Sequence, residues 1–102
     1  MIKITFKENY ISIKGHADYE DMGKDIVCAG VSSIITTTIN AILKYDKTSI
    51  EYTSKSGFVT IKILKDEKIV NLLINNMKDL LKELQTNYQK NIKIEEVPYE
   101  LT

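Results

Sequence analysis

The sequence has no arginine and no tryptophan, and it has only one cysteine, one histidine and one proline in 102 residues. A lone cysteine cannot form an internal disulfide, and without a second cysteine or histidine the chain lacks the usual zinc-binding motifs. Arginine is the usual bidentate ligand of phosphate and guanine, and the 14 basic residues, all lysine, are balanced by 14 acidic ones. The four glycines are not spaced as in a phosphate-binding loop. We therefore expect no metal or other cofactor and no direct nucleic-acid partner.

Long hydrophobic runs are also missing. No apolar run approaches the roughly 20 residues that a membrane-spanning helix needs, and residues 1–7 lack the apolar stretch of a signal peptide. These absences predict a cytoplasmic protein without a membrane partner, whose single thiol stays reduced. A chain of 102 residues, 43% hydrophobic and 27% charged, suits one globular domain, so residues 1–102 are assigned to a single domain.

The sequence does contain a regular succession of strand-like and helix-like segments. Apolar and polar residues alternate at 2–6 and 10–14, which is typical of half-buried strands, and further strands are predicted at 49–53, 58–64 and 91–97. Spacings of three and four predict helices from Asp25 to Tyr45 and from about Glu67 to Gln89. The order ββαββαβ predicts an α+β two-layer sandwich, with both helices on one face of a mostly antiparallel sheet.

Each predicted helix has an apolar face that should meet the sheet. In the first helix the expected face is formed by Ile26, Gly30, Ile34, Thr37, Ala41, Ile42 and Tyr45. In the second helix it is formed by Ile69, Leu73, Met77, Leu80, Leu84 and Tyr88, widened by Leu72 and Leu81.

His16 and Cys28 are the candidate catalytic residues, because an imidazole and a thiol are the minimum for nucleophilic cysteine chemistry. His16 follows the second predicted strand, and Cys28 falls in the first turn of the first predicted helix. A helix N-terminus favours the thiolate, and its unpartnered N–H groups, from Cys28 and Ala29 onward, can receive an oxyanion. The small Ala29 and Gly30 would let a substrate carbonyl approach. His16 is the only histidine available as a general base.

Structural roles compete with these assignments. Cys28 stands in an apolar stretch, where it can equally be a small core residue, and a histidine after a strand can be structural or solvated. Asp25 either orients the imidazole as the third member of a triad or caps the helix, and Asp18 is a weaker triad candidate. The sequence alone leaves open whether the side chains of His16 and Cys28 meet.

Two short elements carry a resemblance to a known family. They are Gly15-His16-Ala17 and, eight residues further on, Asp25-Ile26-Val27-Cys28-Ala29-Gly30-Val31-Ser32. At this separation they resemble the hallmark of the ribosomal-processing cysteine proteases of Firmicutes and related bacteria. The resemblance implies a homodimeric α+β enzyme that removes a short N-terminal extension from a large-subunit ribosomal protein precursor, cleaving after a phenylalanine. It also implies that Cys28 is the nucleophile, His16 the general base and Asp25 a supporting residue.

The substrate-binding residues are indicated less sharply. Ser32 also matches a family position, although a hydroxyl one turn after Cys28 can equally serve packing. Asp18, Glu20 and Asp21 crowd the segment between the two catalytic candidates, where they would steer a basic ribosomal substrate or simply be solvated. Aromatic candidates for the pocket that takes a substrate side chain are Tyr19, Tyr45, Tyr52 and Phe58. The alternative function is a non-catalytic ribosome-associated binding domain, which needs no reactive thiol.

Overall fold

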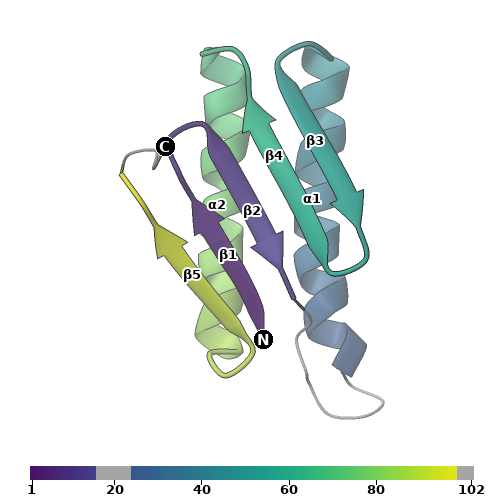
Figure 1. Ribbon diagram of the computed structural model, residues 1–102, viewed down its shortest axis with the longest axis vertical. Coiled ribbons are helices and arrows are strands. Elements are labelled where there is room, and N and C mark those ends of the chain that lie inside the picture. Colours follow the sequence, from purple (N-terminus) through teal and green to yellow (C-terminus); the bar gives the residue numbers. More distant parts are fainter. Residues whose placement is uncertain (16–23, 99–102) are drawn as a thin grey trace.

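The computed structural model describes residues 1–15 and 24–98, with the backbone alone for residues 24 and 25. Within these residues, helices and strands follow one another in the order ββαββαβ (Figure 1). Their bounds are β1 Ile2–Phe6, β2 Tyr10–Lys14, α1 Lys24–Tyr45, β3 Ile50–Lys55, β4 Phe58–Ile63, α2 Lys68–Asn87 and β5 Ile92–Glu96. The predicted element order is confirmed, and the predicted bounds differ from the observed ones by at most two residues.

The strands form one sheet in the order β3-β4-β2-β1-β5. Neighbouring strands are antiparallel except β1 and β5, which run parallel with Ile2 beside Ile92. Both helices lie on one face of the sheet, behind it in the view of Figure 1. The predicted α+β two-layer sandwich with a mostly antiparallel sheet is therefore confirmed. The described elements leave the other face of the sheet uncovered.

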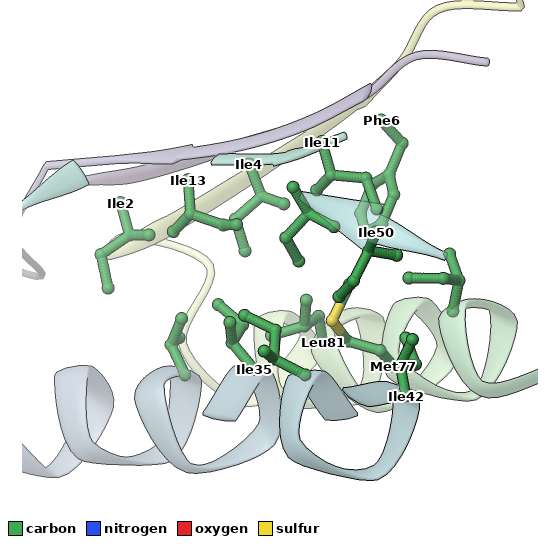
Figure 2. Packing of buried hydrophobic residues seen from close by; sticks show 14 of the residues in the cluster. Ile2, Ile4, Phe6, Ile11, Ile13, Ile35, Ile42, Ile50, Met77 and Leu81 are labelled. Carbon is green, nitrogen blue, oxygen red and sulfur yellow. The ribbon is translucent and has the colours of Figure 1, made fainter. Parts of the chain in front are cut away.

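The core lies between the sheet and the helices and is rich in isoleucine. In β1, Ile2, Ile4 and Phe6 are buried, whereas Lys3 between them is exposed on the opposite face. Burial of one such apolar side chain contributes about 1.5–3 kcal/mol, so the alternation fixes which face of each strand meets the helices. Figure 2 shows the strand side chains above those of the helices, which include Ile35, Ile42, Met77 and Leu81.

The buried faces of both helices differ from the predicted faces by about one residue. The core residues of α1 are Val27, Val31, Ile35, Ile39 and Ile42. Ile26 and Tyr45, which were expected to be buried, are 57% and 51% exposed. The buried residues of α2 are Val70, Ile74, Met77 and Leu81. The expected members that are exposed instead are Ile69, Leu72 and Leu80. The predicted stripes are wrong at these exposed positions, because neighbouring apolar residues let part of each face be drawn one position early. Other predicted members are confirmed, because they are buried or pack against the core: Ile34, Ile42, Leu73, Met77, Leu81, Leu84 and Tyr88.

Helix α1 is long and apolar enough to cross a membrane by length and composition, with a mean hydropathy of 1.8 over Ile26–Tyr45. The expectation that no apolar run approaches this length is wrong for this segment. The structure gives the apolar residues another role, because Val27 and Ile42 are fully buried and belong to the core between helix and sheet. The composition of α1 therefore follows from its place in the fold.

A polar cluster fixes the end of α1 that lies furthest from Cys28. Asp46, the residue after α1, accepts hydrogen bonds from the hydroxyl and the backbone N–H of Thr48, at 2.7 and 2.9 Å. Lys65 Nζ lies 3.1 Å from Asp46 Oδ2. These donors, the Thr48 hydroxyl above all, hold the pKa of Asp46 well below its ordinary value. A hydrogen bond with Asp46, together with burial, raises the pKa of Glu67.

We expect Glu67→Gln to raise the free energy of unfolding at about pH 8 but to leave it little changed at about pH 4. Glu67 must be protonated to donate to Asp46. Because its folded pKa is raised, its contribution is fully present below the ordinary pKa of 4.5 and is lost as the pH rises through the raised value. A glutamine amide donates at every pH. Urea unfolding at the two pH values measures the effect, with Glu83→Gln on the exposed side of α2 as the control. A Glu67→Gln protein that is less stable than the wild type at pH 8 would contradict the raised pKa of Glu67.

Candidate active site

Cys28 is the fifth residue of α1 and begins its second turn. Val27 before it is fully buried and Ile26 is exposed, so Cys28 lies at the border of the core, half-buried and packed against it. Its other side lines an open groove beside the helix. The thiol thus has the fixed position and the partial access that a nucleophile needs.

The groove runs between α1 and the hairpin formed by β3 and β4, and it has a volume of about 520 Å³. Volumes of this size are typical of binding pockets. The helix wall of the groove is a polar stripe with a spacing of four residues, formed by Cys28, Ser32, Thr36 and Asn40. The sheet wall contains Tyr52 and Ser54 of β3 and residues 56–58 of the turn into β4.

The groove exists because β3 stops being apolar after Ile50. Ile50 is buried, but Tyr52 and Ser54, the next two positions on the same face of the strand, are exposed. The strand register places them beside Ile61 and Val59 of β4, so they point to the helix side of the sheet. A tyrosine and a serine at these positions do not close the gap to α1 as the isoleucines of β1 do. The gap is therefore available to a ligand.

The dimensions of the groove suit an extended peptide. From Cys28 to Asn40 the helix rises by about 18 Å, at about 1.5 Å per residue, which equals the length of about five extended residues. Within the described residues β3 is an edge strand that pairs only with β4. The outer backbone groups of β3 can therefore pair with a bound chain.

Charge is sparse around the groove. Lys55 is the one charged residue among the described residues that line it. The floor between the polar walls is aliphatic and includes Ile13, Val31, Ile35 and Val59. Over the part of the chain that the structure describes, no three His, Cys, Asp or Glu side chains gather as a metal site requires. The groove therefore suits a largely uncharged stretch of polypeptide.

Gly15 brings the end of β2 to the same groove. It lines the groove together with Cys28, has a φ of +98°, and donates its N–H to the carbonyl of Gly57 at 2.8 Å. His16 is the next residue in the sequence, and it lies outside the described residues. The same holds for four other predicted site residues: Asp18, Tyr19, Glu20 and Asp21. Their proposed roles stay predictions.

Helix α1 begins one residue before the predicted start. The helix begins at Lys24, so Asp25 lies inside its first turn and is not the N-cap residue. The unpartnered N–H groups of a helix belong to its first turn, and the N–H groups of Cys28 and Ala29 fall in the hydrogen-bonded ladder that follows. The role of these N–H groups in binding an oxyanion stays a prediction. The triad role of Asp25 stays a prediction.

Gly30 faces the second helix and does not line the groove. A Cβ atom built on Gly30 would lie 3.2 Å from Cδ2 of Leu84 on α2, so the glycine allows the two helices to pack closely. Ala29 is exposed and is also absent from the groove-lining residues of the described chain. Of the small residues that were expected to bind substrate after Cys28, only Ser32 lines the groove.

Sequence reasoning missed several polar groove residues, among them Thr36, Asn40 and Ser54. Of the aromatic candidates, Tyr52 and Phe58 line the groove. Tyr45 does not, because it ends α1, far along the helix from Cys28. A signal was present in the sequence, because polar residues recur every fourth position after Cys28, directly beside the buried stripe of the helix.

A half-buried thiol at one end of a peptide-sized groove, on a small two-layer α+β fold, is the arrangement of a cysteine-dependent peptide hydrolase. Comparison with known families makes the class definite. Residues 1–93 match the family described as cysteine protease Prp, and the chain belongs to this family.

Individual relatives agree with this assignment. A protein from Mycoplasma genitalium called ribosomal processing cysteine protease Prp is 31% identical and matches 98% of this chain and 100% of its own length. The protein of the same name from Staphylococcus aureus is 32% identical over 82% of each chain. Two crystal structures of an essential ribosomal processing protease Prp from S. aureus have the same fold. The complex with a covalently linked product peptide has a TM-score of 0.82 at 24% identity, and the complex with a substrate peptide has 0.80 at 23%. Each covers 94% of this chain and 97% of the S. aureus chain.

Proposed function

We propose that this cysteine protease removes the N-terminal extension of a large-subunit ribosomal protein precursor by hydrolysing the peptide bond that follows an aromatic residue. The observation that carries the proposal is the place of Cys28 at one end of the groove. The ribosomal substrate is supported by the relatives from M. genitalium and S. aureus, which are called ribosomal processing proteases. Membership of a protease family favours this function over a non-catalytic ribosome-associated binding domain.

In the proposed reaction the Sγ atom of Cys28 attacks the carbonyl carbon of the scissile bond. His16 takes the thiol proton and gives it to the leaving amine, which becomes the new N-terminus of the ribosomal protein. The extension remains on Cys28 as a thioester. Water then attacks the thioester while His16 takes its proton, and the extension leaves with a free carboxylate. The role of His16 in these steps rests on the sequence motif.

The aliphatic floor of the groove supports cleavage after an aromatic side chain. Ile13, Val31 and Ile35 line the groove together with Cys28, and Tyr52 lines it from β3. An aromatic ring that enters this space leaves water for an apolar surface, which contributes about 1.5–3 kcal/mol. Binding of the ring in the groove would place the next peptide bond, the one to be cleaved, beside the thiol of Cys28.

Replacing the phenylalanine before the scissile bond of the extended precursor by alanine is therefore expected to lower kcat/KM about 10- to 100-fold, at about 1.4 kcal/mol per tenfold change. Product formation is followed by mass spectrometry, which also locates the cleaved bond. The control is the same change placed more than five residues from the bond, beyond the reach of the groove. Equal cleavage of all three precursors would contradict an aromatic-binding groove, and an intact wild-type precursor would contradict the proposed substrate.

We further propose that the enzyme acts as a homodimer in the cytoplasm. The family resemblance implies the dimer, and Ile69, Leu72 and Leu80 offer an apolar surface on α2, with exposures of 40%, 62% and 40%. The cytoplasm keeps a catalytic thiol reduced. Sedimentation of the protein at twice its chain mass of 11.7 kDa supports the dimer, and a monomer at micromolar concentration contradicts it.

A further inference from the structure

The uncovered face of the sheet carries a row of lysines that crosses the strands. The face is the one toward the viewer in Figure 1, with both helices behind it. Strand register places five side chains of this face side by side, one from each strand in the order β3-β4-β2-β1-β5, and these residues are called the lysine row below. The lysine row consists of Lys55, Phe58, Lys14, Lys3 and Lys93. At about 4.8 Å per strand it spans about 19 Å.

Two pairs of like charges stand directly opposite one another in the lysine row. Lys3 is the register partner of Lys14 on β2 and of Lys93 on β5. Like charges opposed across strands destabilise a sheet. Glu95 offsets part of the repulsion, with carboxylate oxygens 3.7 Å from Lys3 Nζ and 3.4 Å from Lys93 Nζ. The remaining repulsion lowers the stability of the sheet. An anion bound to this face would offset the repulsion, which explains why the lysines stand there.

The charges of the whole chain cancel, but those of this face do not. Its strand residues include five lysines and two glutamates, a net charge of +3, within a chain whose net charge is zero. These residues are Lys3, Lys14, Lys55, Lys62, Lys93, Glu51 and Glu95. A polyanion that approaches this face therefore meets a positive electrostatic field, although the net charge of the whole chain is zero.

Aromatic and hydroxyl side chains accompany the lysines. Lys14 Nζ lies 5.4 Å from the ring centre of Phe58, and Lys7 Nζ lies 5.9 Å from that of Tyr10. The register row beside the lysine row carries hydroxyl groups on four strands, at Thr53, Thr60, Ser12 and Thr5. Lysines for phosphates, rings for stacking and hydroxyls for ribose together match the surfaces that bind single-stranded nucleic acid.

We propose that this sheet face binds single-stranded RNA. Lysine contacts a phosphate as a point charge, and without arginine the face has no bidentate donor for guanine, so binding is expected to be independent of base sequence. The absence of arginine therefore argues against sequence-specific recognition but not against this contact. An anionic membrane is the less suitable partner, because among the described strand residues of this face only Phe58 and Tyr10 carry large rings that could insert. The proposal does not depend on the ribosomal substrate, although RNA binding would bring the protease to ribosomal particles if that substrate is correct.

The test measures binding of the full-length protein to a fluorescent 12-nucleotide oligo(U) by anisotropy. We expect a Kd in the range of about 10⁻⁶–10⁻⁴ M that weakens with salt, with a slope in log K against log salt of about −2 to −3 for three or four phosphate contacts. The triple variant Lys3→Gln, Lys14→Gln, Lys93→Gln should weaken binding at least tenfold and reduce the slope by about 2. Phe58→Leu should weaken it about tenfold through lost stacking and leave the slope unchanged.

The matched control is the triple variant Lys44→Gln, Lys68→Gln, Lys90→Gln, which removes the same charge from exposed sites outside the sheet face. It should bind RNA nearly as the wild type does. The control triple should keep the wild-type urea midpoint, whereas the lysine-row triple should keep or raise it, because it removes like charges that oppose one another across strands. Both triples should cleave a short peptide at the wild-type rate, which separates RNA binding from protease function. Equal losses in the two triples, or wild-type binding to phosphatidylglycerol vesicles without binding to oligo(U), would overturn the proposal.

Discussion

Cys28→Ala is expected to lower kcat/KM for cleavage of the extended ribosomal precursor by at least about 10⁴-fold. Without a thiol no thioester can form, and removal of the nucleophile from a cysteine or serine hydrolase leaves only the contribution of substrate binding and of electrostatic stabilisation. The change should hardly disturb the fold, because Cys28 is half-buried at the edge of the core and the substitution removes only its thiol group. Cleavage is measured by mass spectrometry, and the fold by urea unfolding of the same preparation.

Ser32→Ala is the matched control for this experiment. Ser32 stands one turn after Cys28 on the same polar stripe and lines the same groove, but it has no role in the proposed bond-making steps. We expect a loss of at most about tenfold, expressed mainly in KM. Cleavage that persists in a folded Cys28→Ala protein would remove Cys28 from the mechanism. If instead Ser32→Ala were as inactive as Cys28→Ala, the hydroxyl would belong to the catalytic machinery.

The element order could be read from the sequence, but the helix faces could not. In α2 the apolar residues occur as neighbours, such as Leu72 beside Leu73 and Leu80 beside Leu81. Each pair allows two faces that differ by about 100° around the helix, and local periodicity does not choose between them. The choice is made by tertiary packing, because Leu81 fits beneath the sheet, where it is fully buried, while Leu80 remains 40% exposed.

The family could also be predicted from the sequence, whereas the groove beside Cys28 could not. Cys28 stands in the motif that carries the family resemblance, so its candidacy as the nucleophile needs only the local sequence. The groove depends on Tyr52 and Ser54 of β3 lying across from α1, which requires the strand register and the layer spacing of the whole fold. The direction of Gly30 toward Leu84 depends on the packing of the two helices. Residues chosen from their spacing along the chain therefore line the groove where they follow one helix face, as Cys28 and Ser32 do, and Gly30 does not line it because the second helix lies on its side.

Gly15→Ala is expected to lower the free energy of unfolding by about 2–4 kcal/mol. The φ of +98° at Gly15 is a conformation that alanine adopts only with strain of about 1–3 kcal/mol. A Cβ atom at this position would also collide with the backbone carbonyl oxygen of Met1. That oxygen cannot easily withdraw, because the N–H of buried Ile2 is bonded to the carbonyl of Asn91 at 2.8 Å. Urea unfolding measures the loss.

Gly30→Ala provides the comparison that separates this strain from the general effect of replacing a glycine. Gly30 is helical, its new Cβ would meet only the flexible end of Leu84 at 3.2 Å, and alanine favours the helix by about 1 kcal/mol, so we expect a net change within about 1 kcal/mol. Gly15→Ala should also lower kcat/KM at least about 100-fold at temperatures where the variant is still folded. The reason is that Gly15 lines the groove with Cys28 and directly precedes His16. Similar stability losses in both variants would show that the backbone at Gly15 tolerates a side chain. A folded Gly15→Ala enzyme with full activity would show that the conformation of Gly15 does not position the base.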